Sequence, residues 1–385
     1  MKQWQEFQGV YIHIPFCLQK CRYCDFVSYA GCSDSLINEY VQALVAEIAQ
    51  RSLPLPINAG ASVYFGGGTP SLLANEDLAR IVTALKDSGI WQNPCEVTIE
   101  VNPATATLEK MLFWRGLGID RISIGVQSLN DEELRLAGRL HNAAAALETI
   151  ATAQKAGFAK ISCDLIYGLP GQSAVSFADG LQRLLQGGIK HISLYNLMVE
   201  EETPLAQMLQ TGALALPEED AVDEMYDLAQ SITAAYGLER YEISNYAMPG
   251  AESKHNLVYW QYLPYLAFGC AACSFVQGRR LTGYEGLTEY IGAVKAGRIA
   301  GVYESIEEQV ALEEFVFMGL RTAKGISLAT AKARFGCDLR EYYRAEIEAT
   351  RTLGLVELNT GANTLKLTAK GMRYCRRVFE IFVKS

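Results

Sequence analysis

Six short apolar segments rich in β-branched residues recur along the first two-thirds of the chain, each followed by a helical stretch. The predicted strands are Val10–Ile14, Ser62–Phe65, Glu96–Glu100, Arg121–Val126, Lys160–Ile166 and His191–Tyr195. The predicted helices are Ser35–Arg51, Asn75–Lys86, Thr107–Leu117, Asp131–Leu136, Asn142–Ala156 and Ala174–Leu185. Strands that alternate with helices in this way favour a parallel sheet. We therefore predict an α/β fold, a partial (β/α)6 barrel over residues 1–240.

Glycines, cysteines and polar residues gather where these predicted strands end. A cysteine-containing loop follows the first strand, and Gly66–Pro70 (GGGTP) follows the second. Asn102 and Pro103 follow the third, Gln127 the fourth, and a GLPGQ segment the fifth. In barrels of parallel strands, ligands bind at the carboxyl ends of the strands, on the loops that lead into the helices. The sequence therefore predicts one functional site at this rim.

The remainder of the chain differs from this repeat. Residues 241–304 are predicted to be an irregular connecting region that contains the segment HNLVYW. After it, the predicted elements are helices at Ile306–Leu320, Leu328–Phe335 and Leu339–Leu353, two short strands in LVELNTGANTLKLT, and a helix at Lys370–Phe382. This order is typical of a winged-helix-like α+β module over 305–385. The module carries a net charge of +3 and the rest −12, a contrast that supports a separate domain. A charge of +3 is too weak to indicate DNA binding, so we expect a small docking domain.

Composition narrows the possible functions. A net charge of −9 argues against non-specific binding to nucleic acid. No apolar run approaches the roughly 20 residues of a membrane span, and the first residues, MKQWQEFQGV, do not resemble a secretion signal. Ten cysteines are too sparse for a disulfide scaffold, so we expect reduced thiols and a cytoplasmic location.

Three of the cysteines are spaced as metal ligands. Cys17, Cys21 and Cys24 form a C-x3-C-x2-C pattern directly after the first strand. Closely spaced thiolates of one loop can bind an iron–sulfur cluster, and three ligands on a four-iron cluster leave one iron open to another molecule. The alternatives are a structural zinc site, with His13 or Cys32 as the fourth ligand, and three unrelated core cysteines.

A family resemblance rests on several motifs in a fixed order. YIHIPFC-x3-C-x2-CDF, YFGGGTPS, EVNP, RISIGVQS, DLIYGLPGQ and HNLVYW resemble the coproporphyrinogen-oxidase-like branch of the radical S-adenosylmethionine (radical-SAM) superfamily. Within this branch the chain is most similar to the HemW family of heme chaperones, over nearly its whole length. The resemblance implies a radical-SAM barrel that uses a [4Fe-4S] cluster, SAM and heme. The implied partners are an apo-hemoprotein or cytochrome recipient and an electron donor such as flavodoxin or ferredoxin, with peripheral membrane association possible.

The same resemblance implies a set of SAM contacts. They are Tyr11, Gly67, Gly68, Thr69, Glu100, Gln127, Arg139 and Asp164, with backbone contacts at Met198 and Cys273. Glycine lets backbone approach a ligand closely. Glu100 is suited to accept hydrogen bonds from the ribose or the ammonium group of SAM, and the guanidinium of Arg139 to pair with its carboxylate.

Two features separate a heme chaperone from a coproporphyrinogen III dehydrogenase. The dehydrogenase has another cysteine two residues after the cluster motif, where this chain has Phe26, and a longer extension before it, where this chain has sixteen residues. Both differences argue against decarboxylation of a porphyrinogen. A radical-SAM methyltransferase that degrades heme ranks below both, because HNLVYW together with a winged module is not expected in it. The sequence therefore predicts a protein that binds heme and delivers it.

The HNLVYW segment carries the implied heme contact. In the HemW family this motif implies that His255 is an axial heme ligand, with Tyr259 and Trp260 packing on the macrocycle. The alternative is a hydrogen-bonded structural histidine. The chain departs from the family's G-x-G-A-H-S motif, because Cys273 replaces its histidine. Cys273 is then a heme ligand, a metal-binding partner of Cys270, or a small buried side chain.

Overall fold

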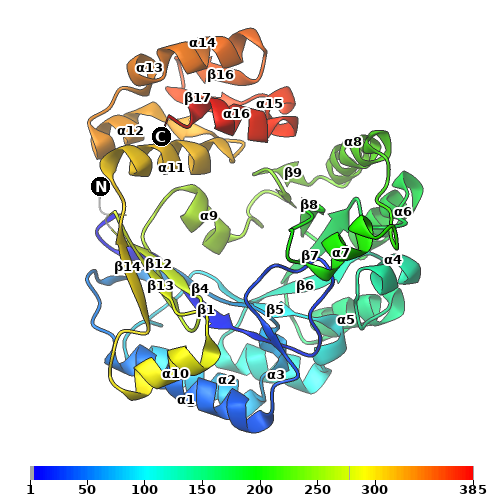
Figure 1. Ribbon diagram of the computed structural model, residues 1–385, viewed down its shortest axis with the longest axis vertical. Helices are drawn as coiled ribbons and strands as arrows, with labels where there is room; N and C mark the ends of the chain where they lie inside the picture. The colour runs from blue at the N-terminus through cyan, green and yellow to red at the C-terminus, as the bar shows by residue number, and fades with distance from the viewer. Residues whose placement is uncertain (1–3, 277, 385) are drawn as a thin grey trace.

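The computed structural model describes residues 4–276 and 278–384. Figure 1 shows a strongly curved sheet with helices on its outer side and a smaller domain above its open side. The sheet has 12 strands in the order β14-β13-β12-β11-β1-β4-β5-β6-β7-β8-β10-β9. It is open, because β14 and β9 are its edge strands within the described residues. The predicted α/β class with a partial barrel is confirmed.

All six predicted strands are present. They are β1 (Phe7–Ile14), β4 (Ile57–Gly67), β5 (Val97–Val101), β6 (Arg121–Gln127), β7 (Lys160–Tyr167) and β8 (His191–Asn196). Each pairs in parallel with the next. Val10, Ile12 and Ile14 share one face of β1 and are fully buried, as expected for a strand face in the hydrophobic core.

The six predicted helices match within one residue at each end. They are α1 (Asp34–Gln50), α2 (Asn75–Asp87), α3 (Leu108–Leu117), α4 (Asp131–Leu136), α5 (Ala143–Lys155) and α6 (Ala174–Gln186). Most begin at a residue whose side chain accepts a hydrogen bond from the first turn, such as Ser33, Thr107 and Asn142. Such caps satisfy amide groups that have no partner inside the helix. Another helix, α8 (Glu219–Ala235), follows the barrel strands.

The prediction that residues 241–304 are irregular is wrong. The segment contains β10 (Asn245–Ala247), α9 (Lys254–Trp260), β11 (Tyr265–Phe268), β12 (Cys273–Val276), β13 (Arg279–Gly283), α10 (Leu287–Lys295) and β14 (Gly301–Ser305). Strand β11 pairs in parallel with β1 and adds a seventh parallel strand, and β12 to β14 extend the sheet antiparallel. These strands are only three to five residues long. Their apolar pattern is therefore too short to be recognised as a strand in the sequence.

The C-terminal domain has the predicted order of elements. Its helices are α11 (Glu308–Leu320), α12 (Leu328–Phe335), α13 (Leu339–Tyr342), α14 (Arg344–Thr352), α15 (Ala369–Arg373) and α16 (Cys375–Phe382). A small antiparallel sheet joins β15 (Ile326–Ser327), β17 (Thr364–Leu367) and β16 (Val356–Asn359). Its hydrophobic core also includes Tyr262, which follows α9, and Phe275 of β12 in the larger sheet. The boundary at Ser305 therefore stays a prediction, because the core crosses it.

An ion pair between a partly buried arginine and a buried carboxylate helps to attach this domain. Arg321, at the end of α11, lies over the ring of Trp260, with its guanidinium carbon 4.4 Å from the ring centroid. Its Nη2 is 3.7 Å from Oε2 of Glu242, a fully buried carboxylate. The end of α9 is thereby tied to the C-terminal domain.

We expect Arg321→Ala to lower the free energy of unfolding by about 3 kcal/mol, because a buried carboxylate loses its charged partner. Denaturant unfolding measures the change. Arg376→Ala is the control, since its ion pair with Glu380 is exposed and contributes about 0.5 kcal/mol or less. Equal losses in the two variants would contradict a stabilising role of the Arg321–Glu242 pair.

Candidate functional site

The loop with Cys17, Cys21 and Cys24 lies at the carboxyl ends of the parallel strands, between β1 and α1. Two contacts hold it against the segment after α4. The amide of Arg22 donates to the carbonyl of Ala137 at 3.1 Å, and its side chain donates to the carbonyl of Leu136 at 3.1 Å. The loop therefore has a defined conformation.

The three thiols lie close enough to interact electrostatically. Burial raises the pKa of Cys24, and the charges of Cys21 and Cys17 raise it further. Nη1 of Arg139 donates to Sγ of Cys21 at 3.3 Å, and Oγ1 of Thr69 donates to Sγ of Cys17 at 3.6 Å. Both contacts place hydrogen-bond donors beside the sulfur atoms of the loop, and a cysteine binds metal through its sulfur as a thiolate.

The two residues considered as a fourth zinc ligand, His13 and Cys32, have other partners. Within the described residues, no three His, Cys, Asp or Glu side chains converge as one metal ion requires. His13 instead contacts the hydroxyl of Tyr11 and the carbonyl of Val27, and the thiol of Cys32 contacts the carbonyl of Tyr29. Nε of Arg139 is buried without a hydrogen-bond partner among the described residues. Its N–H can therefore donate a hydrogen bond to a further ligand.

The glycines after β4 are required by close contacts. A Cβ on Gly66 would lie 2.8 Å from the ring of Tyr64 and 2.9 Å from that of Tyr11. Gly67 has φ +115°, and a Cβ there would lie 2.6 Å from the ring of His13. No side chain fits at either position, so the backbone itself forms this part of the rim.

A cavity of about 460 Å³ lies beside the cysteine loop. Its lining residues are Tyr11, His13, Asp25, Phe26, Val27, Gly67, Glu100, Tyr259, Tyr265, Ala271, Ala272 and Cys273. Three predicted SAM contacts, Tyr11, Gly67 and Glu100, are thus brought together, along with the predicted backbone contact at Cys273. Its volume is in the range of small-molecule sites.

Glu100 is the buried acid of this cavity. Its Oε1 accepts a hydrogen bond from the hydroxyl of Tyr64 at 2.8 Å, and its Oε2 accepts one from the amide of Gly67 at 3.1 Å. Burial raises its pKa to about 7. A cationic ligand in the cavity would stabilise the charged carboxylate and lower this pKa.

The other predicted SAM contacts occupy different places. Thr69 and Arg139 lie against the cysteine sulfurs, as described above, and the amide of Gly68 donates to the carbonyl of Ile14 at 2.9 Å. Gln127 ends β6 with φ +66°, where the register of the strand shifts. Asp164 accepts a hydrogen bond from Ser123 and lines a second, polar cavity of about 60 Å³ inside the barrel.

Glu100 lines both cavities, and the smaller one has room for a few water molecules. Met198, with 66% of its surface exposed, lies outside the lining of either cavity. All of the SAM contacts, those of Asp164 and Met198 included, stay predictions.

His255 is buried within α9. Its Nδ1 is 2.9 Å from Oγ of Ser62, and its Nε2 is 2.8 Å from the hydroxyl of Tyr259. Burial lowers its pKa to about 3, so the ring is neutral. Heme ligation by His255 stays a prediction, and it requires that one of these hydrogen bonds be given up.

The two cysteines that follow have different surroundings. Cys270 is fully buried, and its amide donates a hydrogen bond to the hydroxyl of Tyr40 at 3.3 Å. Cys273 lies on the wall of the larger cavity. A shared metal ion is not supported by this arrangement.

The sequence did not indicate His13, Tyr259 or Tyr265 as cavity residues. The sequence could have indicated His13, because it lies two residues after Tyr11 in β1 and therefore points to the same face of the sheet. Tyr259 was read only as a heme contact, and Tyr265 lies in the region taken as irregular. Their convergence depends on the pairing of β11 with β1.

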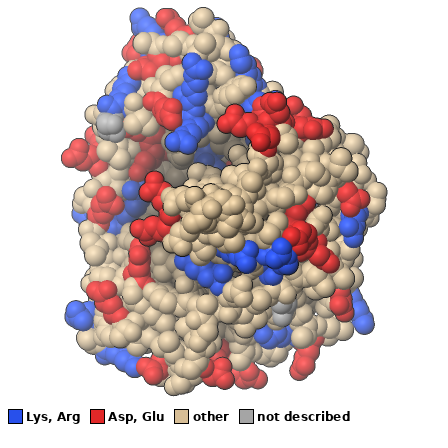
Figure 2. Space-filling model, turned by 45° about the vertical axis from the view of Figure 1, so that its right-hand side comes forward, with Lys and Arg blue, Asp and Glu red and all other residues tan. Residues whose placement is uncertain are grey.

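Apolar side chains are exposed near the cysteine loop. Leu18 and Phe26 of the loop are 55% and 71% exposed. Met198 and Val199 follow β8, and their segment is tied to the loop by the amide of Leu205, which donates to the carbonyl of Arg22 at 2.9 Å. Figure 2 shows a broad uncharged area on one face of the molecule, with a shadowed hollow above it. In the described part of the chain, no helix has the length and hydropathy needed to cross a bilayer.

Two family profiles match the chain. The Radical SAM superfamily matches residues 11–184, and the HemN C-terminal domain matches residues 306–374. Among solved structures, coproporphyrinogen III oxidase (HemN) from Escherichia coli, described as a radical SAM enzyme, superposes with a TM-score of 0.83. It is 21% identical, and the likeness covers 99% of this chain and 91% of that one, so it shows a shared fold.

Curated relatives match over almost the full length. Heme chaperone HemW from Lactococcus lactis is 31% identical over 379 residues, which cover 98% of each chain. Heme chaperone HemW from Bacillus subtilis is 33% identical over 383 residues, which cover 98% of this chain and 99% of the relative.

We expect Cys17→Ala, Cys21→Ala and Cys24→Ala each to abolish binding of the iron–sulfur cluster, because each removes one of its three thiolates. Iron and acid-labile sulfide are measured after anaerobic reconstitution. Cys95→Ala, which removes an exposed cysteine outside the loop, is the control and retains both. Loss of the metal in Cys32→Ala, or its retention in Cys17→Ala, would contradict the ligand assignment.

Glu100 should make the stability of the ligand-free protein depend on pH. Its pKa is about 7 in the folded protein against 4.5 as the ordinary value, so between these values the folded state holds a proton that the unfolded state has released. Stability therefore falls as the pH rises through this range and levels off above about 7. Urea unfolding between about pH 5 and pH 8 tests this. In Glu100→Gln, the fall in stability between about pH 5 and pH 7 should disappear. A pH profile identical to that of the wild type would contradict the assignment of this fall to Glu100.

Proposed function

The chain belongs to the HemW family of radical SAM proteins, and we propose that it binds heme and delivers it to apo-hemoproteins. The observation that carries this proposal is the similarity to proteins named heme chaperone HemW over 98% of the chain. Phe26 supports it, because a cysteine at this position accompanies the dehydrogenase. The 71% exposure of the Phe26 side chain places an apolar ring, and no further thiol, at the mouth of the cavity.

We propose that Cys17, Cys21 and Cys24 hold a [4Fe-4S] cluster and that SAM occupies the adjoining cavity. When bound, the cluster supplies an open iron for SAM and an electron for its reductive cleavage. The residues of the chain would bind SAM and orient it beside the cluster. Glu100 would accept hydrogen bonds from the ammonium or ribose of SAM, and Arg139 has a free Nε beside the cysteines for its carboxylate.

The exposed apolar side chains near the site suit a flat, apolar macrocycle. Leu18 and Phe26 on the cysteine loop, with Met198 and Val199 beyond β8, provide such a surface. Burying apolar area of this kind contributes about 25 cal/mol per Å². His255 lies behind Tyr259, whose hydroxyl contacts Nε2, so ligation through this nitrogen requires Tyr259 to move away.

The partner classes follow from the family. We propose a cytoplasmic protein that receives electrons from a flavodoxin or ferredoxin and passes heme to an apo-cytochrome or another apo-hemoprotein. Peripheral contact with a membrane would bring it to membrane-bound recipients.

Heme titration of the anaerobically reconstituted protein tests the function. We expect a stable heme complex, transfer of heme to an apo-cytochrome, and no conversion of coproporphyrinogen III. His255→Ala should change the heme spectrum, because it removes the predicted axial ligand. His191→Ala is the matched control, since its imidazole is equally buried.

Two results would contradict these assignments separately. Turnover of coproporphyrinogen III with consumption of SAM would replace the chaperone by the dehydrogenase. An unchanged heme spectrum in His255→Ala would remove only this residue from the heme ligands.

A further inference from the structure

Helix α9, which carries the HNLVYW segment, lies in the opening of the curved sheet, below the C-terminal domain (Figure 1). It contacts β1 and β4 on one side and α11 on the other. Its last residue, Trp260, is covered by Arg321. The segment is therefore an internal element of the fold, in contact with the strands that carry the functional site.

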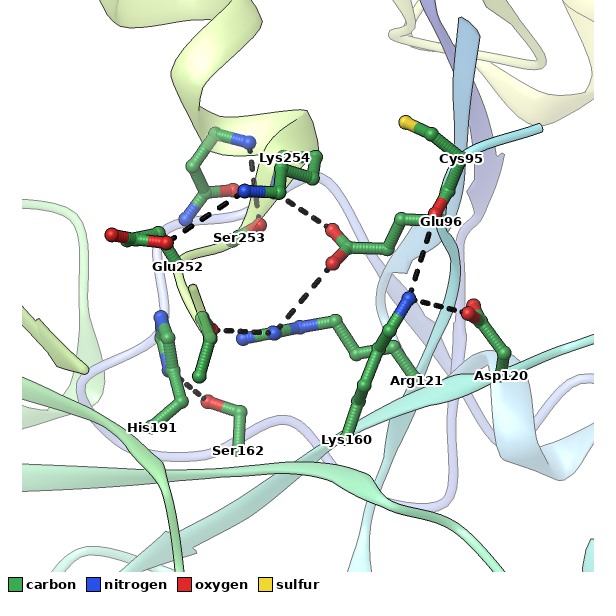
Figure 3. A network of polar contacts seen from close by, with 12 residues as sticks. Cys95, Glu96, Asp120, Arg121, Lys160, Ser162, His191, Glu252, Ser253 and Lys254 are labelled. Carbon is green, nitrogen blue, oxygen red and sulfur yellow. Dashed lines mark hydrogen bonds and ion pairs between the residues drawn. The ribbon is translucent and has the colours of Figure 1, made fainter. Parts of the chain in front are cut away.

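The start of α9 is fixed by a buried polar network (Figure 3). Oε1 of Glu96 accepts a hydrogen bond from the amide of Lys254 at 2.9 Å. Arg121 donates to the carbonyl of Ala251 at 3.2 Å and forms a buried ion pair with Glu96. Ser253 caps the helix by accepting from the amide of Asn256. With both ends fixed, the side chains of α9 are held in place relative to the sheet.

His255 joins this helix to the wall of the larger cavity. Its two ring nitrogens link Ser62 on β4 to Tyr259, and Tyr259 lines the cavity. The imidazole also stacks on the ring of Tyr64, with centroids 5.0 Å apart. Tyr64 in turn donates to Glu100 at 2.8 Å.

Space for the imidazole is provided by a residue without a side chain. A Cβ on Gly9 would lie 3.3 Å from the His255 ring, a contact tighter than most side chains allow. The imidazole contacts the groups that support two parts of the cavity, the phenol of Tyr259 and, through Tyr64, the carboxylate of Glu100.

We propose that Ser62, His255 and Tyr259 form a positioning unit for SAM, which keeps the cavity wall and Glu100 in the geometry that binds this ligand. The inference rests on the proposed function only in taking SAM as the ligand of the cavity. It gives HNLVYW a role that needs no contact with heme.

The chain contains a matched control for this unit. Oγ of Ser162 is 2.7 Å from Nδ1 of His191, a pair that Figure 3 shows, and Nε2 of His191 is 2.9 Å from the hydroxyl of Tyr241. The hydrogen-bond pattern and the burial of this Ser–His–Tyr set equal those of the first. Tyr241, however, lies outside the lining of the larger cavity. Ser162 and His191 line only the smaller cavity and Tyr241 lines neither, so the two sets differ in their contact with the larger cavity, where SAM is proposed to bind.

The experiment compares Ser62→Ala and Tyr259→Phe with Ser162→Ala and Tyr241→Phe in anaerobically reconstituted protein. Equilibrium dialysis gives the Kd for SAM, and electron paramagnetic resonance of the reduced cluster gives the spectral change that SAM produces. Loss of one hydrogen bond from the first unit should raise the Kd about fivefold and weaken the spectral change. The second pair of variants should bind SAM within about twofold of the wild type.

Heme titration separates this role from heme ligation, because Ser62→Ala and Tyr259→Phe retain the imidazole. Weaker SAM binding with intact heme binding supports the positioning unit. Wild-type Kd values in both variants, or equal losses in the control variants, would overturn it while leaving the heme chaperone proposal intact. A wild-type protein that binds heme but not SAM would overturn the unit and the proposed SAM site together.

Discussion

The close approach of the chain at Gly66 and Gly67 is the constraint on which the rest of the site depends. The register of β1 against β4 pairs Tyr11 with Tyr64 and His13 with Gly66. Large rings therefore meet at the same edge of the sheet, and there is room for them only because the following positions carry no side chain. The backbone amide of Gly67 then reaches Glu100. A side chain at either glycine would displace the rings and the carboxylate together.

Burial of polar groups inside the barrel demands partners, and α9 supplies several of them. All four histidines of the chain are buried, and burial lowers the pKa of each. Neutral imidazoles still need one donor and one acceptor, which Ser62 and Tyr259 provide for His255. Glu100 differs, because its partners are an amide and a phenol and its pKa is raised. A buried carboxylate without a cation is costly, so this position is suited to a cationic ligand.

Much of the fold and part of the site could be predicted from the sequence. The strands could be predicted from runs of β-branched residues, and the helix starts from capping residues such as Asn142, because both patterns are local in the sequence. The cysteine spacing is also local. The strands around α9 were missed because they are short, and the environment of His255 depends on pairings between residues about 190 positions apart, as with Ser62. Motif similarity predicts Asp164 as a SAM contact, and the structure adds that it lines the smaller cavity together with Glu100.

The two roles considered for His255 compete for the same atoms. Each ring nitrogen holds one partner, Ser62 or Tyr259, and a nitrogen that binds iron can hold neither. Heme ligation by His255 would therefore break one link of the positioning unit. Since a coupling between two ligands is reciprocal, SAM would weaken heme ligation at His255 to the same extent that heme weakens SAM binding. Loading and release of heme would then respond to occupancy of the SAM cavity through a single imidazole.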